Sequence, residues 1–197
     1  MFNRLRAAIS RIFRYSGAEE YTRRYATMNA FDGVITILGI IFGSVLLGGA
    51  AVKQILAAGI GASIAMAISG ASGTYMTEKA EQERKIKEIE EAMLMRLDGT
   101  LIFKARKKAA IISAIADSLS AMLAGLVTLL PYFAAAARLL TPEAAFYSST
   151  AIALGLLFTL GIFLGKIANK DVIMSGFRSL MIGLVTLLLI TLLNLVL

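Results

Sequence analysis

Two aspartates, Asp32 and Asp117, lie inside stretches of sequence that otherwise consist of apolar residues. They are the only acidic residues of the thirteen in the chain placed in this way. A charged side chain in the hydrocarbon core of a membrane costs about 2.5–3.5 kcal/mol even on the lenient scale of insertion experiments, so such residues usually face a cavity or an ion. The two carboxylates therefore predict a transport path for a cation.

Methionines accompany both aspartates in the sequence. Met28 precedes Asp32 by one helical turn, and Met66 and Met76 lie on a neighbouring apolar run. Thioether sulfur beside a carboxylate suits a borderline divalent cation such as iron or manganese better than magnesium. The chain has no cysteine and no histidine, so a metal would be held by oxygen or by methionine sulfur. We therefore predict an ion path formed by Asp32, Met28, Met66, Met76 and Asp117.

Five apolar runs position these residues. Each is close to the ~20 residues that a helix needs to cross a ~30 Å hydrocarbon core. The runs are Ala30–Val52, Ile55–Thr77, Ala109–Ala137, Ala144–Gly165 and Leu180–Leu197. With 58% hydrophobic and 17% charged residues, the composition leaves no room for a large soluble domain. The predicted fold class is an all-α integral membrane protein with five transmembrane helices and its termini on opposite sides.

The basic residues predict the orientation of these helices. Eighteen of the 20 lysines and arginines fall before residue 30, between residues 79 and 108, or between residues 166 and 178. By the positive-inside rule the N-terminus and the second and fourth connections are cytoplasmic, and the C-terminus is outside. The net charge of +7 is then mostly a topology signal, and no nucleic-acid partner is expected. We expect a prokaryotic plasma membrane.

Two polar segments flank the first two runs. Residues 1–29 form a predicted cytoplasmic segment, in which Phe2, Leu5 and Ile9 share one face of an amphipathic helix that would lie on membrane lipid. The segment lacks the short apolar core and cleavage site of a signal peptide. Residues 30–197 form the predicted five-helix domain, with a cytoplasmic helical linker over residues 78–108.

Glutamates recur through this linker. Glu78, Glu81, Glu88 and Glu91 are spaced by three, seven and three residues, which places them near one stripe of a helix. Carboxylates on one stripe repel each other unless cations neutralise them, as in a metal site with oxygen ligands. The same stretch contains basic residues such as Arg84 and Lys85, so a salt-bridged extension of the second transmembrane helix is the alternative. Both interpretations remain open at this stage.

The second apolar run is rich in small residues. Two ladders at four-residue spacing are Gly59, Ser63, Ala67 and Ala71, and beside them Gly61, Ala65, Ser69 and Gly73. Small residues at this spacing let helix backbones approach closely. We therefore expect this helix at the centre of the bundle, where its glycines either pack helices or line a pathway.

Short motifs in the chain resemble the vacuolar iron transporter family. The stretch Asn29–Thr36, followed by Gly39 and Gly43, resembles the first-helix signature of that family. The segments Leu126–Pro131 and Arg178–Gly183 continue the resemblance. It implies a five-helix subunit that forms a homodimer, with Asp32 on a metal path between subunits, and proton-coupled export of divalent metal from the cytosol.

The chain departs from the family pattern in its second helix. The family has a Met-Ala-x-Gly-Glu pattern there, whereas residues 70–74 read Gly-Ala-Ser-Gly-Thr, so the methionine and the glutamate are missing. The cytoplasmic metal-binding region is also reduced, to residues 78–108. One interpretation is that Asp117 replaces the missing carboxylate, with Met66 or Met76 as substitute sulfur ligands.

The odd number of predicted helices favours an ion path between two chains. Five helices do not divide into two equal repeats, so a symmetric path is more easily formed at a two-fold axis, where Asp32 of each subunit would face its mate. Two facing carboxylates would then exchange protons for metal. A non-transporting scaffold or metal sensor, in which the carboxylates pair with lysine or arginine, is the alternative. No enzymatic activity and no tightly bound cofactor are expected.

Overall fold

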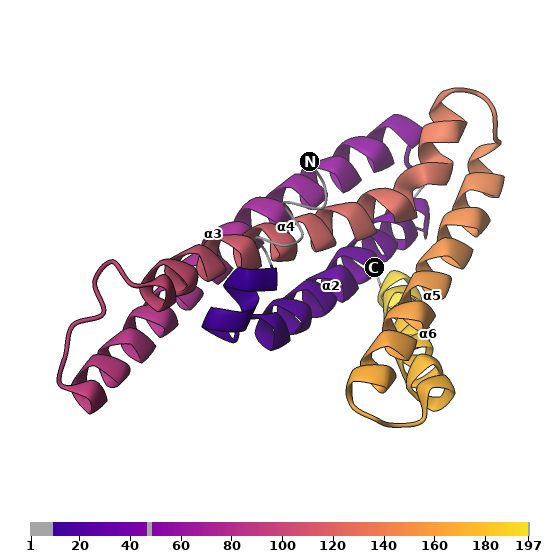
Figure 1. Ribbon diagram of the computed structural model, residues 1–197. Helices are drawn as coiled ribbons and strands as arrows, with labels where there is room; N and C mark the ends of the chain where they lie inside the picture. Colours follow the sequence, from indigo (N-terminus) through magenta and orange to yellow (C-terminus); the bar gives the residue numbers. More distant parts are fainter. Residues whose placement is uncertain (1–9, 47–48, 197) are drawn as a thin grey trace.

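The computed structural model describes residues 10–46 and 49–196, and these residues form helices joined by short turns (Figure 1). Five helices are long and apolar enough to cross a membrane. They are α2 (Glu19–Leu46), α3 (Val52–Met93), α4 (Leu101–Ala136), α5 (Pro142–Ile167) and α6 (Val172–Val196). The predicted all-α chain with five helices of membrane-spanning length and composition is confirmed.

Two helices extend well beyond the apolar runs. Helix α2 begins at Glu19 rather than near Ala30, and α3 continues to Met93. The added residues are mostly Glu, Lys, Arg, Ala and Gln, which favour helix whether or not lipid surrounds them. At 1.5 Å per residue the 42 residues of α3 span roughly 63 Å, about twice the hydrocarbon core. The predicted linker 78–108 thus consists of the ends of α3 and α4, joined by a turn over residues 94–100.

A short helix precedes α2. Residues 10–16 are helical, and Gly17 turns the chain with a positive φ of 68° before α2 begins. The other residues of the predicted amphipathic helix, including Phe2, Leu5 and Ile9, lie outside the described residues.

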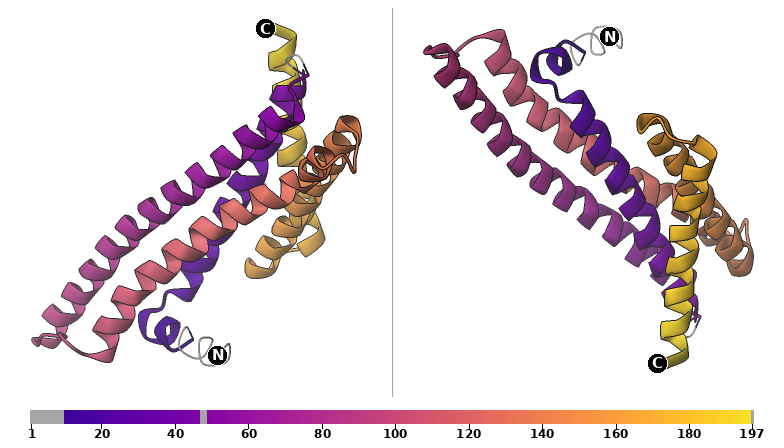
Figure 2. Two further views of the ribbon diagram at one scale, coloured as in Figure 1. Left: turned by 90° about the horizontal axis from the view of Figure 1, so that it is seen from above. Right: turned by 90° about the horizontal axis from the view of Figure 1, so that it is seen from below.

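Helices α2 and α4 together form the centre of the single chain, because α2 contacts all four other long helices and α4 contacts three of them. Helix α4 packs on α3 along most of its length and also on α2 and α5, while α5 and α6 form a hairpin that contacts α2 (Figure 2). The expectation that α3 lies at the centre is therefore wrong for one chain. Only one of its two small-residue ladders is covered. Gly59 and Ser63 are buried against α4, whereas Gly61 and Gly73 are exposed and would have open space around an added methyl group.

Buried apolar side chains join α2 to three other helices. The main cluster draws residues from α2, α3, α4 and α5: Ile37, Ile41, Ile55, Leu56, Leu129, Tyr132 and Ala145. A second cluster joins α2 to α5 through Val34, Leu38, Ala153 and Leu157. Both clusters lie in the apolar parts of the helices, away from the α3–α4 turn. They leave the polar residues of α2, α3 and α4 to meet nearer that turn.

Gly33 lets α2 and α4 approach closely. A Cβ atom at this position would overlap the backbone carbonyl oxygen of Ala121, which cannot rotate away. We predict that Gly33→Ala separates the two helices and lowers stability by about 1–3 kcal/mol, the usual cost of overpacking. Gly43→Ala is the matched control, because Gly43 is on the same helix and has no atom within 4 Å of the added Cβ. Equal melting temperatures of the two purified variants in detergent would contradict this contact.

Candidate functional site

The carboxylate of Asp117 lies where α2, α3 and α4 meet. Its side chain is completely buried. The amide of Asn29 on α2 donates a hydrogen bond to Oδ1, and the hydroxyl of Thr74 on α3 donates one of 2.5 Å to Oδ2. Hydrogen bonds to a charged group contribute about 1.5–3 kcal/mol each. Asp117 therefore ties three membrane helices together through neutral donors.

The surrounding backbone makes room for this carboxylate. A Cβ on Gly70 of α3 would lie 3.2 Å from Oδ2 of Asp117, closer than most real contacts allow. One turn earlier on α4, the Ser113 hydroxyl lies 2.6 Å from that of Thr22 on α2. These small and polar residues form a continuous seam that brings α4 against both neighbours. The register of the seam places Asp117 between Asn29 and Thr74.

Asp32 has a different environment. It is exposed on the surface of the single chain, as is Met28 one turn before it, whose exposed fraction is 57%. The side chain of Asp32 forms no hydrogen bond or ion pair with any other residue in the described ranges. Asn29 lies between Met28 and Asp32 in the sequence, and its side chain reaches inward to Asp117. Asn29 and Asp32 are three residues apart and therefore about 60° apart around α2, so the exposed carboxylate lies at the edge of the helix face from which Asn29 reaches the buried one.

The two methionines of α3 that were predicted as metal ligands differ in exposure. Met66 is partly buried and Met76 is 70% exposed. Within one chain, the described residues contain no group of three or more acidic side chains arranged to hold a metal ion. The predicted ion-path residues therefore lie on two helix surfaces and one buried position, and do not form a closed site in a single chain.

The glutamate stripe divides into two environments. Glu81, Glu88 and Glu91 are partly or fully exposed and pair with basic residues of the same helix at 3.0–4.0 Å, namely Arg84, Lys85 and Lys87. Glu78 is only 3% exposed, and its Oε2 atom has no hydrogen-bond partner among the described residues. The contacts of the three exposed glutamates are those of a salt-bridged helical extension.

A buried polar chain below Asp117 was not anticipated from the sequence. The amide of Gln82 on α3 donates to the hydroxyl of Tyr21 on α2 at 2.7 Å, and its oxygen accepts from Arg106 on α4 at 3.0 Å. Asp117 and Arg106 are eleven residues apart, which is three helical turns and therefore one face of α4. Thr74, Glu78 and Gln82 similarly follow one face of α3 at four-residue spacing. This periodicity of polar residues was a usable signal for a second inward-facing stripe.

Asn29 was also missed as a partner of Asp117. It stood out only as part of a short motif, because nothing in its local sequence shows which helix its side chain faces. Thr74 stood out as the residue at the place of the family's missing glutamate. The structure brings Asn29, Thr74 and Asp117 together and leaves Asp32 apart.

Comparisons with known proteins agree with this architecture. Residues 85–193, more than half of the chain, match the VIT family. The matched residues contain Asp117, whereas Asp32 lies before them. An uncharacterized protein of Methanocaldococcus jannaschii is 31% identical over 158 residues, which are 79% of each of the two chains. The resemblance predicted from the motifs is thereby confirmed, and the chain belongs to the VIT family, a family of membrane transporters for metal ions.

Proposed function

We propose that this protein exports divalent transition-metal cations, iron or manganese, from the cytosol in exchange for protons. Membership of the VIT family supports metal-ion transport across a membrane. The observation that carries the proposal is a pair of carboxylates in membrane helices without a basic partner. Neither Asp32 nor Asp117 forms an ion pair in the described part of the chain, where the recorded pairs all lie between residues 81 and 98.

This observation disfavours the scaffold alternative. In a scaffold the membrane carboxylates would be neutralised by lysine or arginine, because an unpaired charge in a low-dielectric region is costly. In the described part of the chain, the carboxylate of Asp117 has only an amide and a hydroxyl as partners, and the carboxylate of Asp32 has none. A carboxylate left in this state is available to bind a cation or a proton. A transport role therefore accounts for the two residues better than a structural role does.

The surface around Asp32 is compatible with a second copy of the chain. Met28 and Asp32 are exposed on α2, and the uncovered ladder of α3 presents Gly61 and Ser69. Small residues on an exposed helix face allow close packing in a membrane. We propose a homodimer in which Asp32 and Met28 of both chains line the metal path, with Met66 and Met76 as further sulfur ligands. The two Asp32 carboxylates would then hold one divalent cation or share protons.

Asp117 is proposed as the second carboxylate of the path. Thr74 stands where the resembled family has a glutamate, and in this chain its hydroxyl donates to Asp117. We propose that in this chain α4 supplies, through Asp117, the carboxylate that α3 supplies in the resembled family. Because Asp117 is buried, a cation reaches it only when the hydrogen bonds from Asn29 and Thr74 give way. Exchange of those two donors for a cation is the proposed gating step.

Orientation follows the distribution of charge. The short helix at residues 10–16, the start of α2, the end of α3 and the start of α4 carry most basic residues, and we place this end in the cytoplasm. Asp32 and Asp117 then lie in the cytoplasmic half of the bundle, where an exported ion enters. The basic end would rest on anionic lipid of a prokaryotic plasma membrane.

Metal flux into vesicles tests the proposed function. Purified protein in liposomes loaded with a metal-quenched dye is expected to admit Fe²⁺ and Mn²⁺ much faster than empty liposomes. Magnesium and calcium should enter at the rate of the empty control, because these cations prefer ligand sets made of oxygen alone to sets that include thioether sulfur. A dimer that binds no metal and passes none would favour the scaffold.

A further inference from the structure

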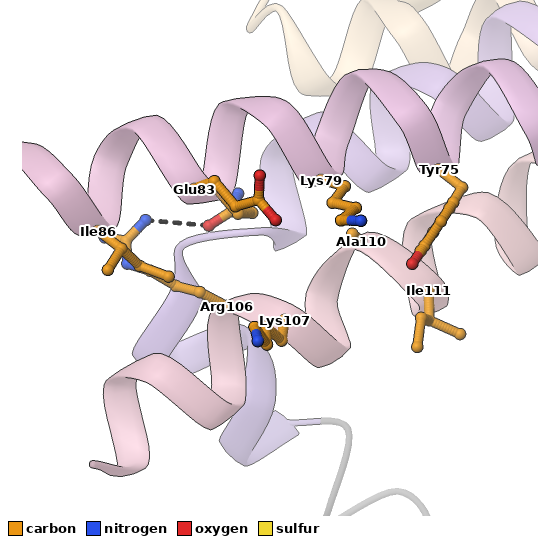
Figure 3. Close-up of a pocket in the computed structure, with 9 residues that line it drawn as sticks. Tyr75, Lys79, Glu83, Ile86, Arg106, Lys107, Ala110 and Ile111 are labelled. Carbon is orange, nitrogen blue, oxygen red and sulfur yellow. Dashed lines mark hydrogen bonds between the residues drawn. The ribbon is translucent and has the colours of Figure 1, made fainter. Parts of the chain in front are cut away.

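A pocket of about 320 Å³ lies between α3 and α4, where the apolar part of each helix ends (Figure 3). A volume of this size is within the range of small-ligand sites. The pocket contains none of the proposed ion-path residues. Its occupant is therefore a separate question from that of the transported ion.

Three cations line this pocket against one carboxylate. Lys79 comes from α3, Arg106 and Lys107 come from α4, and Glu83 is the acidic residue. Neither lysine forms an ion pair with a described residue, although Lys107 lies 4.6 Å from the ring centre of Phe103. The pocket therefore has an excess of positive charge.

Arg106 adds a buried donor that lacks an acceptor. Its NH1 group donates to Gln82, but its Nε atom is buried and has no partner among the described residues. A buried N–H group without an acceptor costs free energy comparable to a lost hydrogen bond. Arginine forms strong, geometrically defined hydrogen bonds with phosphate oxygens. An anion in the pocket would supply the missing acceptor.

The lining becomes apolar toward the membrane-spanning part of the helices, while Ile86 adds one apolar side chain at the opposite end, beside Arg106. Figure 3 shows Tyr75 and Ile111 together at one end of the pocket, and Arg106 toward the other. Tyr75 precedes Lys79 by four residues, about 6 Å along α3. The apolar end points toward the membrane-spanning part of the helices, and tyrosine is typical of the membrane–water interface. The pocket is amphipathic in the same direction as a membrane lipid.

We propose that this pocket binds one anionic glycerophospholipid. The headgroup phosphate would contact Lys79, Arg106 and Lys107, and the first part of an acyl chain would lie along Ala110 and Ile111. A free phosphate shares the headgroup chemistry but leaves the apolar end empty, which is why we favour the lipid. Bound between α3 and α4, the lipid would hold the two helices together about two to three turns below Asp117.

Native mass spectrometry of the full chain tests this proposal. The protein in neutral detergent is titrated with phosphatidylglycerol, and Lys79→Gln/Lys107→Gln is expected to retain this lipid at least tenfold more weakly than wild type, since a basic residue near the headgroup contributes about a factor of five. Lys104→Gln/Lys108→Gln is the control, because it removes two exposed charges of α4 that do not line the pocket. It should retain the lipid like wild type. Glu83→Gln should strengthen retention.

Three results would overturn the proposal. Equal losses in the pocket pair and the control pair would mean that only general surface charge attracts the lipid. Retention of phosphatidylcholine as strong as that of phosphatidylglycerol would show that net anionic charge is not recognised. If inorganic phosphate raised the melting temperature as much as phosphatidylglycerol does, the ligand would be a free anion. A selective thermal shift with phosphatidylglycerol, lost only in the pocket pair, would support the lipid.

Discussion

Asp117→Asn is expected to reduce metal transport at least tenfold, and adding Thr74→Asp to this variant should restore a large part of it. Asparagine keeps the size of the side chain but removes its charge. Aspartate in place of Thr74 would put a carboxylate near the present hydroxyl, which lies 2.5 Å from Oδ2 of Asp117. If the path requires one negative charge at this junction, either helix can supply it. Initial rates of metal entry into liposomes measure both effects.

The control for this exchange is Thr74→Asn in the Asp117→Asn background. It has the same shape as the rescuing variant and no charge, so it should remain inactive. Asp117→Asn should also lower stability by about 1–3 kcal/mol, because the amide NH2 group replaces one of the two oxygens that now accept from Asn29 and Thr74. Normal transport by Asp117→Asn would mean that Asp117 only joins helices. Equal rates for the two double variants, Thr74→Asp and Thr74→Asn each combined with Asp117→Asn, would refute the relocated carboxylate.

Asp32→Asn is expected to abolish transport without weakening the fold. Asp32 is exposed and has no partner in the described part of the single chain, so its charge contributes little to the stability of that chain. We expect at least a tenfold loss of metal flux and a change in stability within about 0.5 kcal/mol. This combination separates a residue of the ion path from one that holds helices together.

Asp98→Asn is the matched control for Asp32. Asp98 is exposed in the α3–α4 turn and pairs with Arg96 at 3.0 Å, so the substitution removes one surface charge away from the membrane helices. It should leave both flux and stability near wild type. A large loss of stability in Asp32→Asn, with the metal flux per folded molecule unchanged, would contradict this prediction. Asp32 would then hold the structure together and would not belong to the ion path.

The apolar pattern predicted the helices well and their ends poorly. Hydropathy reports which residues tolerate lipid, and α3 continues to Met93 because its polar residues are also good helix formers. The same limit explains the error about the central helix. Small residues such as Gly61 and Gly59 look alike in sequence, but only Gly59 contacts α4 in the single chain. From the sequence alone, a helix face that stays exposed in the single chain cannot be distinguished from one that packs against another helix of the same chain.

The candidate site was predictable in its residue types and not in its contacts. Asp117 was expected to be a membrane carboxylate because of its apolar surroundings. Its hydrogen bond with Asn29 depends on the register of α2 against α4, which Gly33 sets through close backbone contact. The glutamate stripe shows a related limit. At 3.6 residues per turn, Glu78 and Glu91 differ by about 140° around α3, so one faces inward while the other reaches solvent.

Simultaneous recording of metal and proton movement in liposomes tests the central claim most directly. Vesicles that contain the purified protein, a pH-sensitive dye and a metal-sensitive dye are exposed to Mn²⁺ or Fe²⁺ on the outside. We predict that metal entry is accompanied by proton release from the vesicle lumen, that an acidic lumen accelerates it, and that Asp32→Asn removes both signals together. Metal entry no faster than in empty vesicles, or proton movement unchanged by Asp32→Asn, would contradict proton-coupled metal transport through this path.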